Sequence, residues 1–173
     1  KCKLMNAKYY KVPQSRERLI FIGIRNDLKE QPSFPKPLKK IIKVKEALKN
    51  IKNKTFANKL TINMLDLYKK LNYGEHGDKI KGKGKYFSTT KINPYKPINT
   101  IRKSSNSGYL HWNEERYLTI EEAKKLSSFP DNFKLNGFYS NQWAVIGNSV
   151  PPKMMYYIAK NLKENILNQR LRN

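Results

Sequence analysis

The sequence is poor in the residues that hold small or metal-dependent folds together. It contains one cysteine, Cys2, which excludes an internal disulfide and a zinc site built from several cysteines. The two histidines, His76 and His111, are far apart and lack the spacing of metal ligands, so no metal is indicated. No run approaches the roughly 18 apolar residues of a membrane span, and no signal peptide is visible. We therefore expect neither a metal cofactor nor a membrane partner.

Acidic residues are also scarce relative to basic ones. The 173 residues include 13 Asp and Glu against 36 Lys and Arg, which gives a net charge of +23. Self-repulsion of this size destabilises a compact monomer unless a polyanion accompanies it, and nucleic acid is the usual polyanion. A Lys-rich surface without a binding role is the alternative interpretation. Because the basic residues lie along the whole chain, charge alone does not locate a site.

The N-terminal segment combines long polar side chains with an apolar run. Gln14, Arg16 and Arg18 fall at every second position, so an extended backbone would place them on one face. Residues 19–24 form a continuous apolar run, which predicts a strand buried on both faces. Two guanidinium groups on one strand face offer donor forks to a phosphate or a base carbonyl. The alternative is a surface strand whose charges pair with Glu17 or another neighbour.

The spacing of apolar residues predicts helices ahead of a loop. Residues 38–51 carry apolar side chains at helical intervals with lysines on the other face, and residues 60–71 form a second helical candidate. Residues 74–85 are rich in Gly and Lys and predict a loop. Short β-like pieces such as residues 99–102 follow.

Two helix starts are marked near the C-terminus. Thr119 and Glu122 have the spacing of a capping box, so a helix is predicted to begin there and to end before Phe129. A final helix is predicted to begin near Pro151 and Pro152, because proline suits the first helical turn.

The segment 147–152, Gly-Asn-Ser-Val-Pro-Pro, is predicted to be a turn that leads into this final helix. Free backbone amides and a small hydroxyl at a helix N-terminus can meet a polar ligand. Ordinary capping of the helix by Asn148 or Ser149 is the alternative interpretation.

The Gly/Lys segment invites two interpretations. Residues 77–83 superficially match a nucleotide-binding P-loop, but Gly84 replaces the required Ser or Thr and no apolar strand precedes, so we reject that match. Wrapping of a DNA backbone by Lys81, Lys83 and Lys85 is favoured over a merely solvated loop, since the glycines allow close approach. Further candidates for base-edge or phosphate contacts are Lys91, Arg102, Lys103, Ser104, Ser105 and Asn106.

Three segments resemble C-terminal sequence blocks of the DNA (cytosine-5) methyltransferases. Residues 6–25, with a Gln-x-Arg-x-Arg core, are similar to the eighth block, residues 116–133 to the ninth and residues 142–152 to the tenth. They occur in the order of the family, with a basic variable region between the first two. Lys11 stands where many relatives carry glycine. The resemblance covers nearly the whole chain, most loosely over residues 38–93.

The resemblance implies a reaction and roles for the strand residues. In this family the target cytosine is flipped out of the duplex, and a cysteine thiolate adds to its carbon 6. Carbon 5 then takes the methyl group of S-adenosylmethionine. By the resemblance, Arg18 would contact the flipped cytosine, while Arg16 and Gln14 would orient the catalytic loop or hold phosphate.

The resemblance also implies roles for the C-terminal segments. Asn148, Ser149 and Val150 would border the S-adenosylmethionine pocket. The final helix would lie against the catalytic domain. Residues 129–131 and Trp143 would build the hinge between the recognition region and the scaffold.

The catalytic segments of the family do not occur in these 173 residues. The glycine-rich cofactor segment, the Pro-Cys nucleophile loop and the Glu-Asn-Val segment are all missing, and Cys2 lacks the Pro-Cys setting. We therefore expect the C-terminal part or a subunit of a bacterial, cytoplasmic enzyme of a restriction-modification system, inactive without an N-terminal catalytic part and acting on double-stranded DNA. The alternatives are a decayed remnant, a non-catalytic basic nucleic-acid-binding protein on the same scaffold, and a tRNA methyltransferase of the superfamily.

The fold expected from the pattern and the resemblance is α+β, with three regions. Residues 1–30 would be a strand block of the catalytic scaffold. Residues 31–115 would be a small, irregular target recognition domain. Residues 116–173 would form the hinge and the C-terminal helices that return to the cofactor-binding scaffold.

Overall fold

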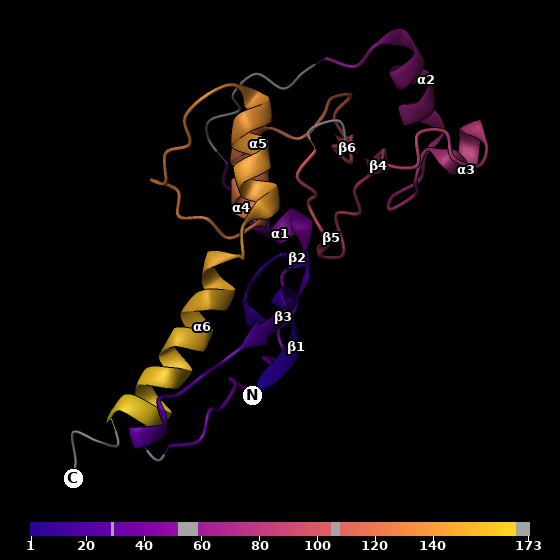
Figure 1. Ribbon diagram of the computed structural model, residues 1–173. Helices are drawn as coiled ribbons and strands as arrows, with labels where there is room; N and C mark the ends of the chain where they lie inside the picture. The colour runs from indigo at the N-terminus through magenta and orange to yellow at the C-terminus, as the bar shows by residue number, and fades with distance from the viewer. Residues whose placement is uncertain (29, 52–58, 105–107, 169–173) are drawn as a thin grey trace.

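Figure 1 shows the computed structural model of the chain, which describes residues 1–28, 30–51, 59–104 and 108–168. Its helices are α1 (Val44–Leu48), α2 (Ile62–Lys70), α3 (Asp78–Lys81), α4 (Ile120–Leu126), α5 (Tyr139–Asn148) and α6 (Pro152–Leu162). Its strands are β1 (Cys2–Asn6), β2 (Gln14–Ser15), β3 (Glu17–Phe21), β4 (Thr90–Lys91), β5 (Ile98–Asn99) and β6 (Tyr109–Leu110). Short 3-10 turns cover Ala7–Tyr10 and Asn26–Leu28, and a π-helical turn covers Lys163–Leu167.

The elements form two groups in space. In Figure 1 the hairpin of β1 and β3 lies beside α6 at one end of the molecule, with α4 and α5 above them and α2 and α3 at the far side. β2 pairs in parallel with β5, Gln14 opposite Ile98, and so joins the first group to the second. The mixture of helices and strands agrees with the predicted α+β class.

The hairpin and α6 share a hydrophobic core, which we call the scaffold core. α6 presents Met154 and Ile158, four residues apart and therefore on one helix face, to the N-terminal residues. The prediction that the final helix begins near two prolines is confirmed, because Pro152 lies in its first turn. The buried members of the scaffold core are Met5, Ala7, Tyr10, Val12, Ile22, Met154 and Ile158.

The apolar run of residues 19–24 does not form a strand buried on both faces, so that prediction is wrong for this chain. β3 ends at Phe21 and its burial alternates from residue to residue. Leu19 and Phe21 are exposed, because β1 and β3 form a two-stranded sheet whose other face alone meets the scaffold core. The apolar run predicts burial on both faces of the strand, but in this chain one face is exposed to solvent.

The second group is built on α4 and α5. The predicted capping box is confirmed: Thr119 Oγ1 accepts a hydrogen bond from the Glu122 amide at 3.1 Å, and Glu122 Oε2 accepts one from the Thr119 amide at 2.9 Å. α4 ends at Leu126, before Phe129, as predicted. The buried members of this central core are Val44, Leu48, Ile92, Ile98, Ile101, Tyr109, Leu118, Ile120, Ala123, Leu126, Phe129, Trp143 and Ile146.

The helix predicted over residues 38–51 is limited to α1, so its predicted length is wrong. The Val44 amide donates to the Lys96 carbonyl at 3.1 Å, and the Lys45 amide donates to the Pro94 carbonyl at 3.0 Å. These long-range bonds replace the intrahelical ones that a longer helix would need. The residues before α1 have apolar side chains at helical spacing, but they form an irregular segment.

The middle segment, residues 31–115, contains little regular structure beyond α1 among its described residues. The helix predicted over residues 60–71 is confirmed as α2. Residues 74–85, predicted as a loop, contain the single turn α3. β4 and β6 pair in parallel, with Thr90 opposite Tyr109. The buried members of the core here are Met64, Leu67, Tyr68, Leu71 and Leu110.

Candidate functional site

Gln14 joins the strand block to the other regions through two hydrogen bonds. Its side chain is fully buried at the start of the short strand β2. Nε2 donates to Ser127 Oγ at 2.9 Å, just beyond α4, and Oε1 accepts from the Ile101 amide at 3.2 Å. One amide side chain thus fixes the backbone at Ile101 and the end of α4 relative to β2.

Arg16 makes a second set of long-range bonds from the break between β2 and β3. Its side chain is only 2% exposed. Nη1 donates to the Ile101 carbonyl at 2.8 Å and Nη2 donates to the Gly147 carbonyl at 2.6 Å, while Nε has no hydrogen-bond partner among the described residues. A buried guanidinium is costly unless it is hydrogen-bonded, so these two carbonyls are what hold it in place. We call Gln14, Arg16, Ile101, Ser127 and Gly147 the polar junction.

Glycine is required at position 147 by close contact between two backbones. A Cβ atom on Gly147 would lie 2.5 Å from the Arg102 carbonyl oxygen, which is far inside van der Waals contact. Trp143, one turn earlier in α5, donates from Nε1 to the same carbonyl at 3.0 Å. The end of α5 therefore lies directly against the backbone at Arg102 and Lys103.

Arg18 occupies a different environment from Gln14 and Arg16. It lies opposite Met5 in the hairpin and is partly exposed. Its Nη1 donates to the backbone carbonyl of Glu17 at 2.7 Å. One interpretation of the sequence was that the charges of this strand pair with the Glu17 carboxylate. This bond of Arg18 is made to the backbone of Glu17 and not to its carboxylate. The guanidinium stays accessible from solvent.

Asn148, Ser149 and Val150 lie where α5 ends, not at the start of α6. Asn148 is the exposed last residue of α5, and Ser149 Oγ donates back to the Ile146 carbonyl at 2.8 Å. Val150 lies against the scaffold core. The interpretation that Asn148 or Ser149 caps the final helix is wrong, because Pro151 is the N-cap of α6 and makes no side-chain cap bond.

The structure brings the N-terminal strand segment and the segment of residues 147–152 together. The bond from Arg16 to Gly147 spans 131 positions and connects the strand block to the segment that precedes Asn148. Ser127, Ile101 and Gly147 were missed as site residues, since two of them contribute backbone atoms only. The sequence carries no side-chain signal for such contacts.

Two of the predicted DNA-binding lysines make bonds to α2. Lys81 Nζ donates to Asp66 Oδ2 at 3.1 Å. Lys91 Nζ donates to the Tyr68 carbonyl at 3.1 Å and lies 4.1 Å from the centre of the Tyr68 ring. Burial lowers the pKa of Lys91, and the ring face compensates part of the lost hydration.

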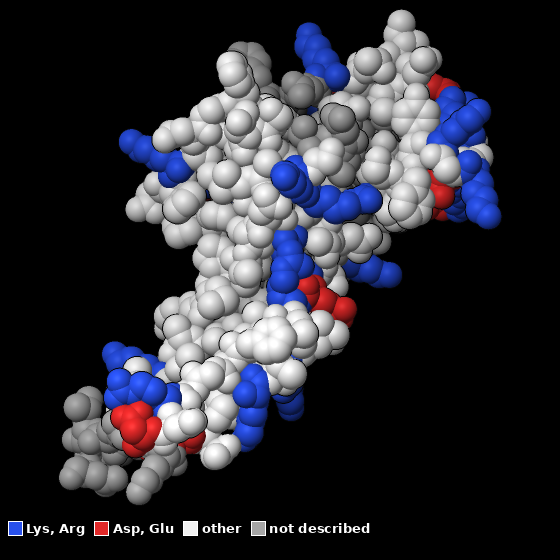
Figure 2. Space-filling view, in the orientation of Figure 1, with Lys and Arg blue, Asp and Glu red and all other residues white. Residues whose placement is uncertain are grey.

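The remaining DNA-binding candidates are more accessible. Lys83 and Lys85 are exposed and alternate with Gly82 and Gly84, whose φ angles are +91° and +85°. Lys103 and Ser104 are exposed, while Arg102 donates to the Ser88 carbonyl at 3.3 Å. Ser105 and Asn106 lie outside the described residues. Figure 2 shows Lys and Arg spread over one face, with acidic side chains among those near α2 and α3.

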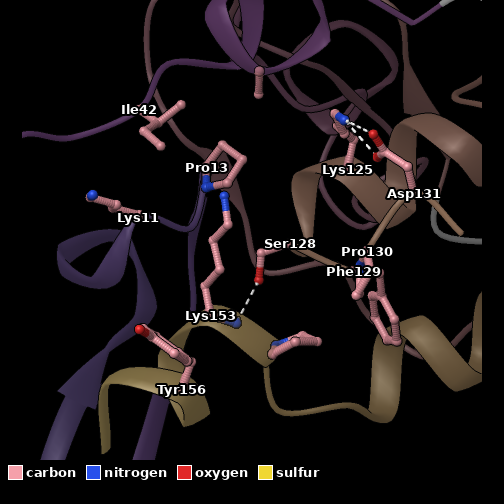
Figure 3. Close-up of a pocket in the computed structure, with 12 residues that line it drawn as sticks. Lys11, Pro13, Ile42, Lys125, Ser128, Phe129, Pro130, Asp131, Lys153 and Tyr156 are labelled. Atoms are coloured by element: carbon pink, nitrogen blue, oxygen red, sulfur yellow. Dashed lines mark hydrogen bonds and ion pairs between the residues drawn. The ribbon is translucent and has the colours of Figure 1, made fainter. Parts of the chain in front are cut away.

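Two of the predicted hinge residues lie within the group of elements built on α4 and α5. Phe129 and Trp143 are buried in the central core. Beside them a cleft of about 510 Å³ runs between α4 and the start of α6 (Figure 3). Lys125 forms an ion pair with Asp131 there, and the Lys153 amide donates to Ser128 Oγ at 3.1 Å. The cleft is lined by Lys11, Pro13, Ile42, Ala47, Lys125, Ser128, Phe129, Pro130, Asp131, Pro152, Lys153 and Tyr156.

A buried ion pair fixes the start of α4. Arg116 Nη1 and Nη2 each donate to a carboxylate oxygen of Glu122 at 2.8 Å. Burial alone would raise the pKa of Glu122, but the hydrogen bonds from Arg116 and the Thr119 amide hold it below its usual value. Hydrogen bonds to Glu122 raise the pKa of Arg116.

Neither a membrane-crossing element nor a metal-binding cluster occurs in the described part of the chain. No helix there is long and apolar enough to cross a bilayer. No group of three or more His, Cys, Asp or Glu side chains in the same residues is arranged to hold a metal ion.

Solved structures define the fold class as that of a methyltransferase. A crystal structure described as a DNA modification methyltransferase encoded within an Escherichia coli prophage matches with a TM-score of 0.79, over 97% of this chain and 60% of that chain. The S. pombe Dnmt2 methyltransferase matches with a TM-score of 0.59, over 96% and 57%. Sequence identities of 22% and 16% limit these comparisons to the fold.

Residues 1–164 match the family of C-5 cytosine-specific DNA methylases, and the chain belongs to this family. M.MJ0563P of Methanocaldococcus jannaschii, assigned as a type II methyltransferase, is 34% identical over 168 residues, covering 94% of this chain and 51% of that protein. The type II methyltransferase M.Sau96I of Staphylococcus aureus is 31% identical, covering 92% and 42%. This chain spans about half the length of the curated relatives it matches. Members of the family take their methyl group from S-adenosylmethionine.

Proposed function

We propose that this chain is the C-terminal part, or a subunit, of a DNA (cytosine-5) methyltransferase. It supplies target recognition and one side of the sites for the flipped cytosine and S-adenosylmethionine. The observation that carries the proposal is the polar junction, in which Arg16 and Gln14 bond at once to the recognition region, the end of α4 and the end of α5. The family model matches residues 1–164, and the chain covers about half the length of its relatives. Both observations support the proposal that a separate N-terminal part carries the catalytic segments.

Arg18 is our candidate for contact with the flipped cytosine. Its accessible guanidinium can donate to a base carbonyl, which accumulates charge during addition to carbon 6. For Arg16 and Gln14 the internal hydrogen bonds support an orienting role over the holding of phosphate. The side chains of Arg16 and Gln14 would keep Arg18 at a fixed position relative to the end of α5.

The residues at the end of α5 and directly after it fit one wall of a methyl-donor pocket. The exposed Asn148 amide can donate and accept hydrogen bonds, and the partly exposed Ser149 retains acceptor lone pairs beside its bond to Ile146. Val150 adds an apolar surface. S-adenosylmethionine supplies an activated methyl group when bound, and the remaining walls would come from an N-terminal part.

The recognition role is assigned to residues 31–115, between the strand block of residues 1–30 and the hinge and helices of residues 116–173. The exposed lysines of the glycine loop can reach phosphate without breaking internal bonds. Other candidates would first have to release their internal partners. Lys83, Lys85, Lys103 and Ser104 are exposed, whereas Lys81, Lys91 and Arg102 are partly exposed. The partner would be double-stranded DNA in the cytoplasm of a bacterial cell.

Reconstitution tests this proposal. The chain would be mixed with the polypeptide encoded upstream that carries a Pro-Cys segment, and transfer of tritiated methyl groups to duplex DNA would be measured. We expect incorporation from the mixture and none from either part alone. Duplex binding without incorporation would favour a non-catalytic nucleic-acid-binding protein. Competition by tRNA over duplex at a fixed salt concentration would favour a tRNA methyltransferase.

A further inference from the structure

We propose that the cleft between α4 and the start of α6 binds a nucleoside phosphate, a role separate from target recognition and methyl transfer. The phosphate lies against Lys11 and Lys153, and the base lies against Tyr156 and an apolar wall. We call this space the lysine cleft. Its volume of about 510 Å³ falls within the range of roughly 300–1,000 Å³ of small-molecule sites, and a duplex is too large to enter it.

Two lysines of the cleft have ammonium groups without a bonded partner. Lys11 and Lys153 are exposed, and their ammonium groups make no hydrogen bond or ion pair with another described residue. Lys125 is paired with Asp131, the one carboxylate among the described residues that line the cleft. Figure 3 shows Lys153 between Lys11 on one side and this pair on the other. Because lysine stems are long and flexible, two positive charges can converge on one phosphate.

A buried hydroxyl with an unused proton also lines the cleft. Ser128 is only 7% exposed, and its Oγ accepts a hydrogen bond from the Lys153 amide at 3.1 Å (Figure 3). A hydroxyl has one proton to donate besides its acceptor lone pairs. No described residue accepts the proton of Ser128. Because buried polar groups are normally hydrogen-bonded, an acceptor such as a phosphate oxygen fits this position.

Two backbone conformations at the cleft are costly for the residues that adopt them. The φ angle is +56° at Lys11 and +63° at Ser128, in the left-handed region that favours glycine. Tyr86 is the one other residue besides glycine with a positive φ in the described part of the chain. Such conformations gather at ligand sites, where the surrounding structure holds them. Glycine would fit the backbone at position 11 better but would bring no charge, so the lysine points to a role in binding.

The remaining lining of the cleft suits the base of a nucleotide. Tyr156 is 59% exposed and brings an aromatic ring to the cleft from α6. Bases of every identity stack on aromatic rings, because each has a flat π face. The apolar wall consists of Pro13, Ile42, Ala47, Phe129, Pro130 and Pro152. An inorganic anion would leave this wall unused, which favours a nucleoside phosphate.

Calorimetric titration of the chain with ADP at about 0.15 M sodium chloride tests the inference. We expect saturable binding at one site per chain, at least about fivefold tighter than that of pyrophosphate, because a stacked base adds affinity. Tyr156→Ala should abolish this preference and leave pyrophosphate binding within about twofold of the wild type. Equal binding of ADP and pyrophosphate by the wild type, or no saturable binding, would overturn the inference.

Lys11→Gly and Lys153→Ala locate the phosphate. Each should weaken ADP binding at least about tenfold, since each removes a charge that bonds to the phosphate. Lys11→Gly should melt no lower than the wild type, because glycine accepts a φ of +56°. The bond to Ser128 survives Lys153→Ala, because its donor is the backbone amide.

Lys160→Ala is the matched control, since it removes an exposed charge elsewhere on α6. It should bind ADP within about twofold of the wild type. If Lys11→Gly and Lys153→Ala bound ADP as tightly as this control, the lysine cleft would be excluded as the site.

Competition against ADP identifies the ligand. Displacement by S-adenosylmethionine at lower concentration than by AMP would assign the cleft to the methyl donor and overturn the inference. Stronger displacement by an aspartate-rich peptide than by AMP would overturn it in favour of an acidic protein segment. A free nucleotide and the 5′ end of a nucleic-acid strand both combine a terminal phosphate with a base. A 5′-phosphorylated dinucleotide that competes better than AMP would support the strand end as the source, and weaker competition would support the free nucleotide.

The binding measurements do not depend on methylation. A failed reconstitution of the methyltransferase would overturn the proposed function and leave the nucleotide site standing. A failed titration with ADP would overturn the nucleotide site and leave the proposed function standing.

Discussion

Arg16 and Arg18 are two positions apart and share a side-chain type, but they occupy opposite environments. Arg16 is buried and holds two backbone carbonyls from distant parts of the sequence. Arg18 is partly exposed and bonds within its own strand. Substitutions at the two positions should therefore have different consequences, one for the fold and one for the reaction.

Arg18→Ala should abolish methylation by the reconstituted enzyme and change nonspecific duplex affinity by less than about twofold, because one partly exposed contact is a small share of the phosphate term. Tritium incorporation and equilibrium binding would be measured in parallel. Arg25→Ala is the control, since Arg25 is an exposed arginine paired with Asp27. An equal loss of methylation and of binding would contradict the role given to Arg18.

Arg16→Lys should lower the free energy of unfolding by about 1–3 kcal/mol, because a single ammonium cannot satisfy both carbonyls in the geometry of the guanidinium fork. Urea denaturation followed by circular dichroism would measure the change. Arg25→Lys, at an exposed site, should stay within about 0.5 kcal/mol of the wild type. A wild-type value for Arg16→Lys would show that the polar junction is not held by these bonds.

At the scale of elements, α4 is held by bonds at its two ends. The glycine loop after α3 is instead a candidate for DNA contact because its lysines are exposed. α4 starts at a capping box reinforced by Arg116 and ends where Ser127 meets Gln14. The loop after α3 has exposed lysines at every second position, with glycines between them. We therefore expect α4 to respond to pH and the loop to respond to salt.

The ion pair of Glu122 should make α4 sensitive to acid. The pKa of Glu122 in the folded chain lies below its usual value of 4.5. Its stabilisation is therefore present above that value and is lost as pH falls through the lower, folded pKa. Glu122→Gln should lose less unfolding free energy between pH 7 and pH 3 than the wild type does. Glu164→Gln, at an exposed ion pair on the C-terminal turn, is the control; equal losses in all three proteins would exclude this contribution.

Lys83→Ala should weaken binding to all duplexes alike and lower the slope of log affinity against log salt by about one. Binding would be measured at several salt concentrations on unrelated duplexes. Lys160→Ala serves as control, because Lys160 lies on α6, far from the loop in sequence, and faces Glu164. An unchanged slope would remove Lys83 from the phosphate contacts.

At the scale of the whole molecule, charge opposes compaction. A net charge of +23 repels itself, and the hydrophobic cores must hold the chain together against that repulsion. Raising sodium chloride from 0.05 to 0.5 M should therefore raise the melting temperature of the chain without DNA by about 5 °C, through screening. Sucrose at matched osmolality controls for excluded solute. A fall in melting temperature with salt would mean that attractive ion pairs outweigh the repulsion.

What the sequence could predict depended on the range of the interactions. Thr119 and Glu122 predicted the start of α4 because a capping box is local, and Pro152 predicted the start of α6 for the same reason. The length of α1 was not predictable, since the amide of Val44 bonds to the carbonyl of Lys96. The polar junction was equally hidden, because backbone atoms carry no residue identity.

Two adjacent serine hydroxyls at the end of α4 accept hydrogen bonds from β2 and from α6. Ser127 accepts from Gln14 on one side, and Ser128, held at φ +63°, accepts from the first turn of α6 on the other (Figure 3). Rotation of α4 against β2 and α6 would have to break both bonds together, at a cost of about 1 kcal/mol or more for each. Bending of the chain at Ser127 and Ser128 would therefore cost about 2 kcal/mol more than bending at a place without such bonds.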